Sequence, residues 1–562
     1  MGDHDGPGGE RILRPLRPSR AHRSLPTHRS LPTHRSFPDH RPLPGHHLPP
    51  AHRLLLAVCG VFAALSLALV PLTLPLGWDE LVYAGRFSPY APGTPFSAPR
   101  TRGVPFLIAP VAAWSDSVVL LRVWLTLLAT AALYLGFRPW LRVLHRPTAA
   151  PVAAALYGGL WIALFYASSA MPNHYTAMGA VGTVGLFLRP RQSAASRGGI
   201  AAGIALATLM RPNDGAALGL PLLLAALLAP AWRGRGRGHG RVSAVLGGLA
   251  AGALPWIIEA YVRFGGLRER LNQASEVQGH LRPLLSLTHH LTVMDGPLLC
   301  RPCGGDGHRP TVATWWFVLP LLVAVGLWSV RGGRPGAGPG LGPGPGPGPG
   351  PGPGPGPGPG PRERHAPVLR GCLLAVAAAL AIALPYLLLV PYAAPRFLLP
   401  THALLAPPAA LGVLALVDAV RASRWPRAGA AVLGLALAGH LAVQLPLVHG
   451  NARIQAGARG DWARIADVLH EHGVGTDAGT PPRAPHPPHP PCVLRGNASV
   501  IPVAYATGCA PGTPVDPDDP DDPRRPTALV LRRAEPPRWA RAWPRHPVPG
   551  TYAPGWVVHV RP

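Results

Sequence analysis

Long apolar runs recur along the chain and constrain its fold more than any other feature. A helix needs about 20 mostly apolar residues to cross a bilayer, and the sequence offers about eleven candidates. With 48% hydrophobic and only 14% charged residues, the composition is typical of a membrane protein. We therefore expect an all-α polytopic membrane protein. The candidate spans are 54–77, 118–137, 149–170, 174–188, 199–210, 215–231, 243–262, 312–330, 368–390, 398–417 and 428–448.

Arginine-rich loops between these spans predict the orientation of the chain. Short basic loops stay in the cytoplasm, whereas loops outside carry little net positive charge. With the N-terminus inside, every loop expected inside is basic, while 170–175 and 211–215 are not, so 199–231 is predicted to be a hairpin. We expect a multi-pass plasma-membrane protein with a cytoplasmic N-terminus and an extracytoplasmic C-terminus. The inner loops are 138–147, 189–199, 233–241, 331–370 and 421–427.

Composition divides the chain into three regions. Residues 1–53 carry the repeat "HRSLPTHRSLPTHRSFP", which predicts a disordered, basic cytoplasmic tail. Residues 54–450 form the membrane domain, interrupted at 331–367 by a Pro/Gly cytoplasmic loop that can form neither helix nor ladder. Residues 451–562 predict a small extracytoplasmic α/β domain, with a helix in "DWARIADVLHEHG" and strands in "ASVIPVAYATG", "TALVLRRA" and "GWVVHVRP".

The formal charge of +27 does not indicate nucleic-acid binding. The arginines are spread between apolar runs rather than along one face, and no zinc-finger, basic-zipper or RNA-binding signature accompanies them. The chain contains arginine but no lysine. This usage, together with the high content of Ala, Gly and Pro, is typical of a GC-rich genome such as those of actinobacteria. The expected partner is the lipid bilayer.

Four cysteines fall in segments that we expect outside the membrane, where thiols can oxidise. Cys492 and Cys509 lie in the C-terminal domain and are candidates for one disulfide. Cys300 and Cys303, in "CRPC", could close a tight disulfide or bind a metal, although no second ligand pair completes a zinc set.

Two neighbouring carboxylates, Asp79 and Glu80, end the first apolar run at "GWDE". At a membrane interface a carboxylate is reachable and its pKa can be tuned by apolar neighbours. The same loop continues with several arginines and then with 103–114, an apolar segment that is too short to span and suits a helix lying in the interface.

This combination suits the transfer of a group from a lipid-linked phosphate to a hydroxyl. A carboxylate can take the proton of the attacking hydroxyl, and guanidinium groups can stabilise the departing phosphate. Non-catalytic explanations of these residues stay open. The two acids could simply end the helix at the membrane surface, and arginines at helix ends often extend toward lipid headgroups. The candidate phosphate contacts are Arg86, Arg100, Arg102, Arg211 and Arg396, and the candidate pocket residues are Asn173, His174, Tyr175, Asp214 and Tyr392.

The order of these motifs resembles the C-type superfamily of integral membrane glycosyltransferases, which includes protein O-mannosyltransferases and lipid A aminoarabinose transferases. The resemblance covers roughly 54–450 and is carried by "GWDE", "GVPFLIAP", "SVVLLRVWLTLLATAALYLGF" and "APRFLLPTHALLAPPAALG". It implies Asp79 as the catalytic base with Glu80 beside it, Arg396 as a phosphate contact, and inversion at the anomeric carbon. The lack of lysine and the Pro/Gly tract depart from the family pattern.

The resemblance implies a hexosyl- or pentosyltransferase that uses a polyprenyl-phosphate sugar and acts on a glycan, lipid or protein at the outer membrane face. No cofactor is identified, and the need for a metal is open, because the acid pair could hold a divalent cation instead of acting as base. Two alternatives stay open: a transporter or flippase of anionic or lipid-linked substrates, and a non-catalytic membrane scaffold.

Overall fold

The computed structural model describes residues 49–87, 96–233, 237–294, 296–301, 303, 314–331, 361–476, 492–512 and 527–562. Nearly all of the predicted tail 1–53 and most of the predicted loop 331–367 lie outside these residues.

Six of the described helical segments are long and apolar enough to cross a membrane, judged by length and composition. A further pair, α5 (Ala149–Gly158) and α6 (Trp161–Ala167), bends by 77° and brings the number to seven if it is one broken span. The predicted number of about eleven spans is therefore not confirmed. The six long segments contain α1 (Pro50–Leu69), α4 (Val118–Phe137), α11 (Arg237–Arg263), α15 (Pro361–Leu388), α16 (Leu399–Arg421) and α17 (Pro426–Glu471).

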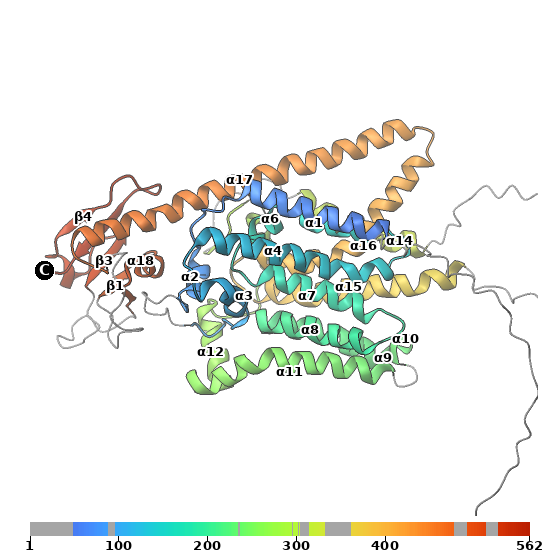
Figure 1. The fold of residues 1–562 in the computed structure, drawn as a ribbon, viewed down its shortest axis with the longest axis horizontal. Coiled ribbons are helices and arrows are strands. Elements are labelled where there is room, and N and C mark those ends of the chain that lie inside the picture. Colours follow the sequence, from blue (N-terminus) through green and yellow to red (C-terminus); the bar gives the residue numbers. More distant parts are fainter. Residues whose placement is uncertain are drawn as a thin grey trace, which may run out of the picture. The chain divides into compact units, whose positions relative to one another are not determined.

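Shorter apolar helices complete the membrane domain and run alongside the long ones (Figure 1). The turn at 211 separates α8 from α9, as the hairpin prediction requires. The apolar ones in the bundle are α8 (Ala194–Met210), α9 (Pro212–Leu228) and α14 (Thr314–Arg331). The bundle also contains α7 (Asn173–Phe187) and the one-turn α10 (Pro230–Arg233).

Glycines let several of these helices approach closely. α14 packs on α16, and a Cβ on Gly326 would lie 2.0 Å from the carbonyl oxygen of Pro408. From the other side, a Cβ on Gly412 would lie 2.1 Å from the carbonyl oxygen of Leu322. Contacts between small residues are the usual way in which helices associate in lipid, where the hydrophobic effect does not drive them together.

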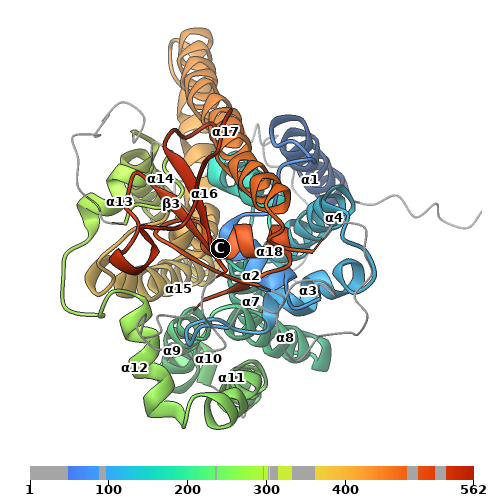
Figure 2. The same ribbon diagram turned by 90° about the vertical axis from the view of Figure 1, so that its left-hand side faces the viewer.

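The polar connections between spans also contain helices. The first connection holds α2 (Trp78–Ala84) and α3 (Gly103–Ala112), so the expected helix at 103–114 is present. Figure 2 shows α2 beside α18 (Val500–Thr507) of the C-terminal region, and the two helices are in contact. The remaining connections contain 3-10 helices at Arg138–Arg142 (η1) and Pro395–Leu398 (η2), and helices α12 (Leu267–Val277) and α13 (Leu287–Val293).

The C-terminal region is an α/β unit built on the end of α17. This helix is continuous from Pro426 to Glu471, so the predicted domain boundary at 450 falls inside it. The sheet has the order β2-β1-β3-β5-β4, with β2, β1 and β3 parallel and the other pairs antiparallel. The strands are β1 (Val493–Gly496), β2 (Ala510–Pro511), β3 (Ala528–Arg532), β4 (Arg545–Pro547) and β5 (Trp556–Val560), with a 3-10 turn η3 at Arg538–Ala540.

One predicted strand is wrong. "ASVIPVAYATG" forms a helix, α18 (Val500–Thr507), although "TALVLRRA" and "GWVVHVRP" contain the predicted strands β3 and β5. The buried residues Val503, Ala504 and Thr507 have helical spacing, which a continuous apolar run of this length does not distinguish from a buried strand.

Candidate active site

Asp79 lies in the first turn of α2, where the chain leaves the first span. Arg100 donates from Nη2 to Asp79 Oδ1 at 2.6 Å, and Arg396 donates from Nη2 to Oδ2 at 3.2 Å. Arg100 comes from the same connection, whereas Arg396 comes from η2, more than 300 residues later. The fold therefore brings together the acid and two of the arginines that the sequence singled out.

The charge of Asp79 is set by these two arginines. Burial alone would raise the pKa of the Asp79 carboxyl, but the positive charges of Arg396 and Arg100 outweigh it and hold the pKa below its usual range. The side chain keeps 31% of its surface exposed. Asp79 is therefore an ionised and reachable carboxylate.

Glu80 has a different environment, because its side chain is only 3% exposed. It accepts hydrogen bonds from Arg122 at 2.6 and 3.0 Å and from Arg459 at 3.2 Å. The backbone N–H groups of Gly77 and Ala170 also donate to it, at 2.7 and 2.8 Å. Burial is opposed mainly by Arg122 and Arg459, and the pKa of Glu80 falls to about 2. Its oxygens are fully engaged in joining four segments of the chain, which contain Gly77 and Glu80 itself, Arg122, Ala170 and Arg459.

A cavity of about 740 Å³ opens beside these acids. Asp79 and Arg396 lie in its wall together with Trp78, which is 42% exposed, and Tyr166 of α6. Arg396 also donates to the hydroxyl of Tyr166 at 3.2 Å. The lining also includes the segment 296–299 and one face of α17, with Asn451, Ile454, Gln455, Arg459 and Trp462. The site thus combines charged, aromatic and apolar surfaces in a volume suited to a small-molecule substrate.

Arg211 and its neighbours adjoin this cluster. The Arg211 guanidinium lies over the rings of Tyr386 and Phe397, at 5.1 and 5.0 Å, and its Nε is 3.4 Å from Asp214 Oδ2. The Phe397 ring also lies under Arg396 and packs against Tyr392. Arg211 and Tyr392 therefore share the Phe397 ring with Arg396, and Asp214 joins this group through Arg211.

Two predicted phosphate contacts lie elsewhere. Arg102 pairs with Glu259 of α11, and its guanidinium lies 4.4 Å from the centroid of the Phe96 ring. Arg86 lies over the same ring at 5.1 Å. Glu259 is nearly buried and also pairs with Arg270, so this second basic cluster surrounds its own acid and is separate from the pairs made by Asp79.

The segment 173–175 is buried inside the helix bundle. His174 is hydrogen-bonded to the Tyr157 hydroxyl and to the Ala129 carbonyl oxygen, both at 3.0 Å, and stacks on Phe62. Asn173 and Tyr175 are also buried, and among the described residues that line the Asp79 cavity none of the three occurs. The reason is that α7 begins at Asn173, so the expected loop is the first turn of a packed helix.

Several residues of the site were not among the sequence candidates. Arg122 is a charge inside an apolar span, and this position was the available signal, because a fully buried arginine needs an acidic partner. Arg459 gave no such signal, since it lies in a polar stretch that runs on from a span. Trp78, Tyr83 and Tyr166 are aromatic neighbours of the acids, and Arg100 lies over the rings of Trp78 and Tyr83.

The structure pairs Cys300 with Cys303 and Cys492 with Cys509 as disulfides. The second links the start of β1 to the start of β2. Within the described part of the chain, no group of three His, Cys, Asp or Glu side chains has the arrangement of a metal site.

No family model and no curated protein matches this sequence. Solved structures do match its fold. ArnT from Cupriavidus metallidurans bound to undecaprenyl phosphate aligns with a TM-score of 0.55 and 14% identity, over 90% of this chain and 97% of that chain. The apo state of the same protein gives a TM-score of 0.52 with the same identity and coverage. An oligosaccharyltransferase from Archaeoglobus fulgidus, tethered with an acceptor peptide, gives 0.45 at 12% identity, over 81% of this chain and 63% of that chain. The two ArnT structures confirm the predicted resemblance for the fold, because this chain has the fold of ArnT along nearly its whole length.

Proposed function

We propose that this chain, which has the fold of ArnT, transfers a sugar from a polyprenyl-phosphate donor to a hydroxyl of an acceptor at the outer face of the membrane. The observation that carries this proposal is the ionised Asp79, held between Arg100 and Arg396 at the wall of a large cavity. The likeness to a structure that contains undecaprenyl phosphate supports the donor class.

In the proposed reaction Asp79 is the base. The acceptor oxygen forms a bond with the anomeric carbon, the bond from that carbon to the phosphate oxygen breaks, and the hydroxyl proton passes to Asp79. Attack from the face opposite the phosphate inverts the anomeric centre. General base catalysis of this kind typically contributes roughly 100- to 10,000-fold in rate.

Arg396 and Arg100 have two roles in this proposal. In the structure they pair with Asp79 and lower the pKa of its carboxyl, which makes it a weak base. A donor phosphate competes for the same guanidinium groups, because a phosphate accepts two N–H groups at once. When Arg396 turns to the phosphate, Asp79 loses a positive neighbour and its basicity rises. Donor binding would in this way activate the base.

A transporter is the main alternative and would need a polar path through the helices. α4 carries Arg122 at the level of the acids and continues with Leu125, Ala129 and Leu133, which are all completely buried. Apolar packing at this depth favours a site that is open at one end.

The substitution Asp79→Asn tests the proposal. We expect sugar transfer to fall at least roughly 100-fold, because the amide cannot accept the proton, while the protein still inserts into membranes. The matched control is Asp116→Asn, which removes an exposed acid close to the start of α4. Transfer by purified protein from a radiolabelled polyprenyl-phosphate sugar is the measurement. Unchanged transfer in the Asp79 variant would exclude Asp79 as the base.

A further inference from the structure

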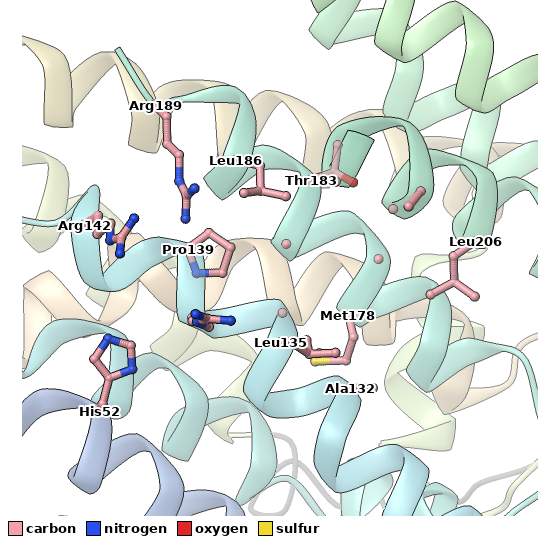
Figure 3. Close-up of a pocket in the computed structure, with 17 residues that line it drawn as sticks. His52, Ala132, Leu135, Pro139, Arg142, Met178, Thr183, Leu186, Arg189 and Leu206 are labelled. Carbon is pink, nitrogen blue, oxygen red and sulfur yellow. The ribbon is translucent and has the colours of Figure 1, made fainter. Parts of the chain in front are cut away.

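A second cavity, of about 470 Å³, lies at the other end of α4 (Figure 3). Arg122, which binds Glu80, and Arg138, which lines this cavity, are 16 positions apart on α4 and its extension, or about 24 Å at 1.5 Å per residue. The two cavities are therefore separate, and a ligand of the second one would not touch Asp79.

Most of the residues that line this cavity are apolar, and they form a groove between α4, α7 and α8. The groove forms because small residues face each other where the helices meet and leave the space above them unfilled. A Cβ on Gly182 would lie 3.3 Å from the Cα of Gly136. A Cβ on Gly179 would similarly lie 2.9 Å from the carbonyl oxygen of Gly203. The rim includes Leu135, which is 58% exposed on a helix long enough to span a membrane. The groove therefore opens toward lipid.

Three arginines gather at one end of the groove. Figure 3 shows Arg142 and Arg189 on the side opposite Leu206, and Arg138 also lines the cavity. Among the described residues, no Asp or Glu forms an ion pair with any of the three. Burial, and then the charges of Arg142 and Arg138, lower the pKa of Arg189. Three positive charges lie close together at a groove whose lining contains no acidic residue, so a bound anion would relieve their mutual repulsion.

A buried hydroxyl gives an independent sign of a ligand. Thr183 lines the groove, is 1% exposed, and its Oγ1 has no hydrogen-bond partner in the described structure. The Nε atom of Arg189 is also buried without a partner. A buried polar group that stays unpaired costs roughly 1–3 kcal/mol, so a ligand that accepts from it gains this energy.

We propose that this groove binds one anionic phospholipid of the surrounding membrane. The phosphate contacts Arg138, Arg142 and Arg189, an ester oxygen accepts from the Thr183 hydroxyl, and one acyl chain lies between α4 and α8 beside Leu135 and Leu206. In the orientation expected from the basic loops, this end of α4 faces the cytoplasm, where anionic lipids are concentrated. The proposal is independent of the sugar-transfer reaction.

Lipid titration followed by native mass spectrometry tests the proposal. The purified full-length protein in detergent is titrated with phosphatidylglycerol or phosphatidylcholine. We expect one phosphatidylglycerol to bind more tightly than phosphatidylcholine. The variant with Arg138→Gln, Arg142→Gln and Arg189→Gln should weaken this binding roughly tenfold or more, because each arginine near an anionic lipid contributes roughly fivefold.

Two further variants separate this site from general attraction. Arg421→Gln, Arg424→Gln and Arg427→Gln together remove the same charge from an exposed turn at the same end of the bundle and should leave binding unchanged. Ala202→Trp adds bulk at an exposed position of the groove wall without changing charge, and should weaken binding even if the triple arginine variant fails to fold.

Three outcomes would overturn the proposal: equal affinity for the two lipids, equal losses in the two triple variants, or undiminished binding to the Ala202→Trp variant. Displacement of the lipid by millimolar inorganic phosphate would also count against it, because that result indicates a site for a soluble anion.

Discussion

At the residue scale, Asp79 and Glu80 show how adjacent carboxylates acquire different roles. Both are ionised, because arginines lower the pKa of each against the effect of burial. Asp79 has two partners and an open face on the cavity, whereas Glu80 is enclosed by four donors. The buried charge of Glu80 is paired on all sides, and removing it would leave Arg122 buried and without its acid.

The substitution Glu80→Gln should therefore destabilise the protein, by roughly 3–5 kcal/mol. The pH dependence of the stability gives a second test of the role of Glu80. The pKa of Glu80 is about 2 in the folded state and ordinarily 4.5, so its stabilisation is present above pH 4.5 and is lost as the pH falls toward 2. The difference corresponds to about 3 kcal/mol. Thermal unfolding in detergent should show a steeper loss of stability below pH 4.5 in the wild type than in the variant, and equal slopes would contradict this account.

Arg396→Gln should change the pH profile of the proposed transfer. Burial raises the pKa of Asp79, and Arg396 is the first of the charges that lower it, so without this arginine the pKa rises. The acid limb of kcat/KM should then move to higher pH, by roughly one unit. Arg396→Lys keeps the charge and should move it less, although donor KM should rise in both variants. An unshifted acid limb in Arg396→Gln would show that the two groups are not coupled.

At the element scale, the strength of the local sequence pattern determined what could be predicted. The span 118–137 coincides with α4 because both of its ends carry signals, a Ser117 cap and the arginine at 138. The run around Val503 was assigned to a strand, because a short apolar segment fits either structure until its neighbours are known. The site followed the same rule: Asp79 and Arg100 lie in one loop, whereas the contacts of Glu80 with Arg122 and Arg459 are set by tertiary packing.

The packing of α14 on α16 predicts a selective effect of one methyl group. Gly326→Ala places a Cβ 2.0 Å from the Pro408 carbonyl oxygen, so the helices must move apart. We expect a loss of stability of roughly 1–3 kcal/mol. Gly434→Ala is the matched control, because nothing lies within 4 Å of its Cβ on α17, and it should be neutral or slightly stabilising. Both are measured by thermal unfolding in the same detergent, and equal melting temperatures would argue against the close contact.

At the scale of the whole molecule, α17 connects the membrane domain to the C-terminal sheet. Its first half is an apolar span, Arg459 in its second half binds Glu80 and the Pro75 carbonyl oxygen, and Asp461 accepts hydrogen bonds from the backbone N–H groups of Tyr552 and Ala553. One helix thus contacts both Glu80 of the membrane domain and the C-terminal sheet unit. The proposed site and the C-terminal unit must consequently lie on the same side of the membrane.

This arrangement makes orientation the most general prediction. The arginine-rich loops predict that the turn at 421–427 lies in the cytoplasm, and one passage of α17 through the membrane would then put the sheet outside. Two variants with one added cysteine each test both positions, Ser423→Cys in that turn and Glu535→Cys on the sheet unit, because both native side chains are exposed. The native Cys59 and Cys372 are buried, and the other four cysteines are paired in disulfides. In intact cells a membrane-impermeant maleimide should label the Glu535→Cys variant and not the Ser423→Cys variant, and both should react after lysis. The reverse pattern would place the Asp79 cavity inside the cell and would remove the basis for transfer at the outer face.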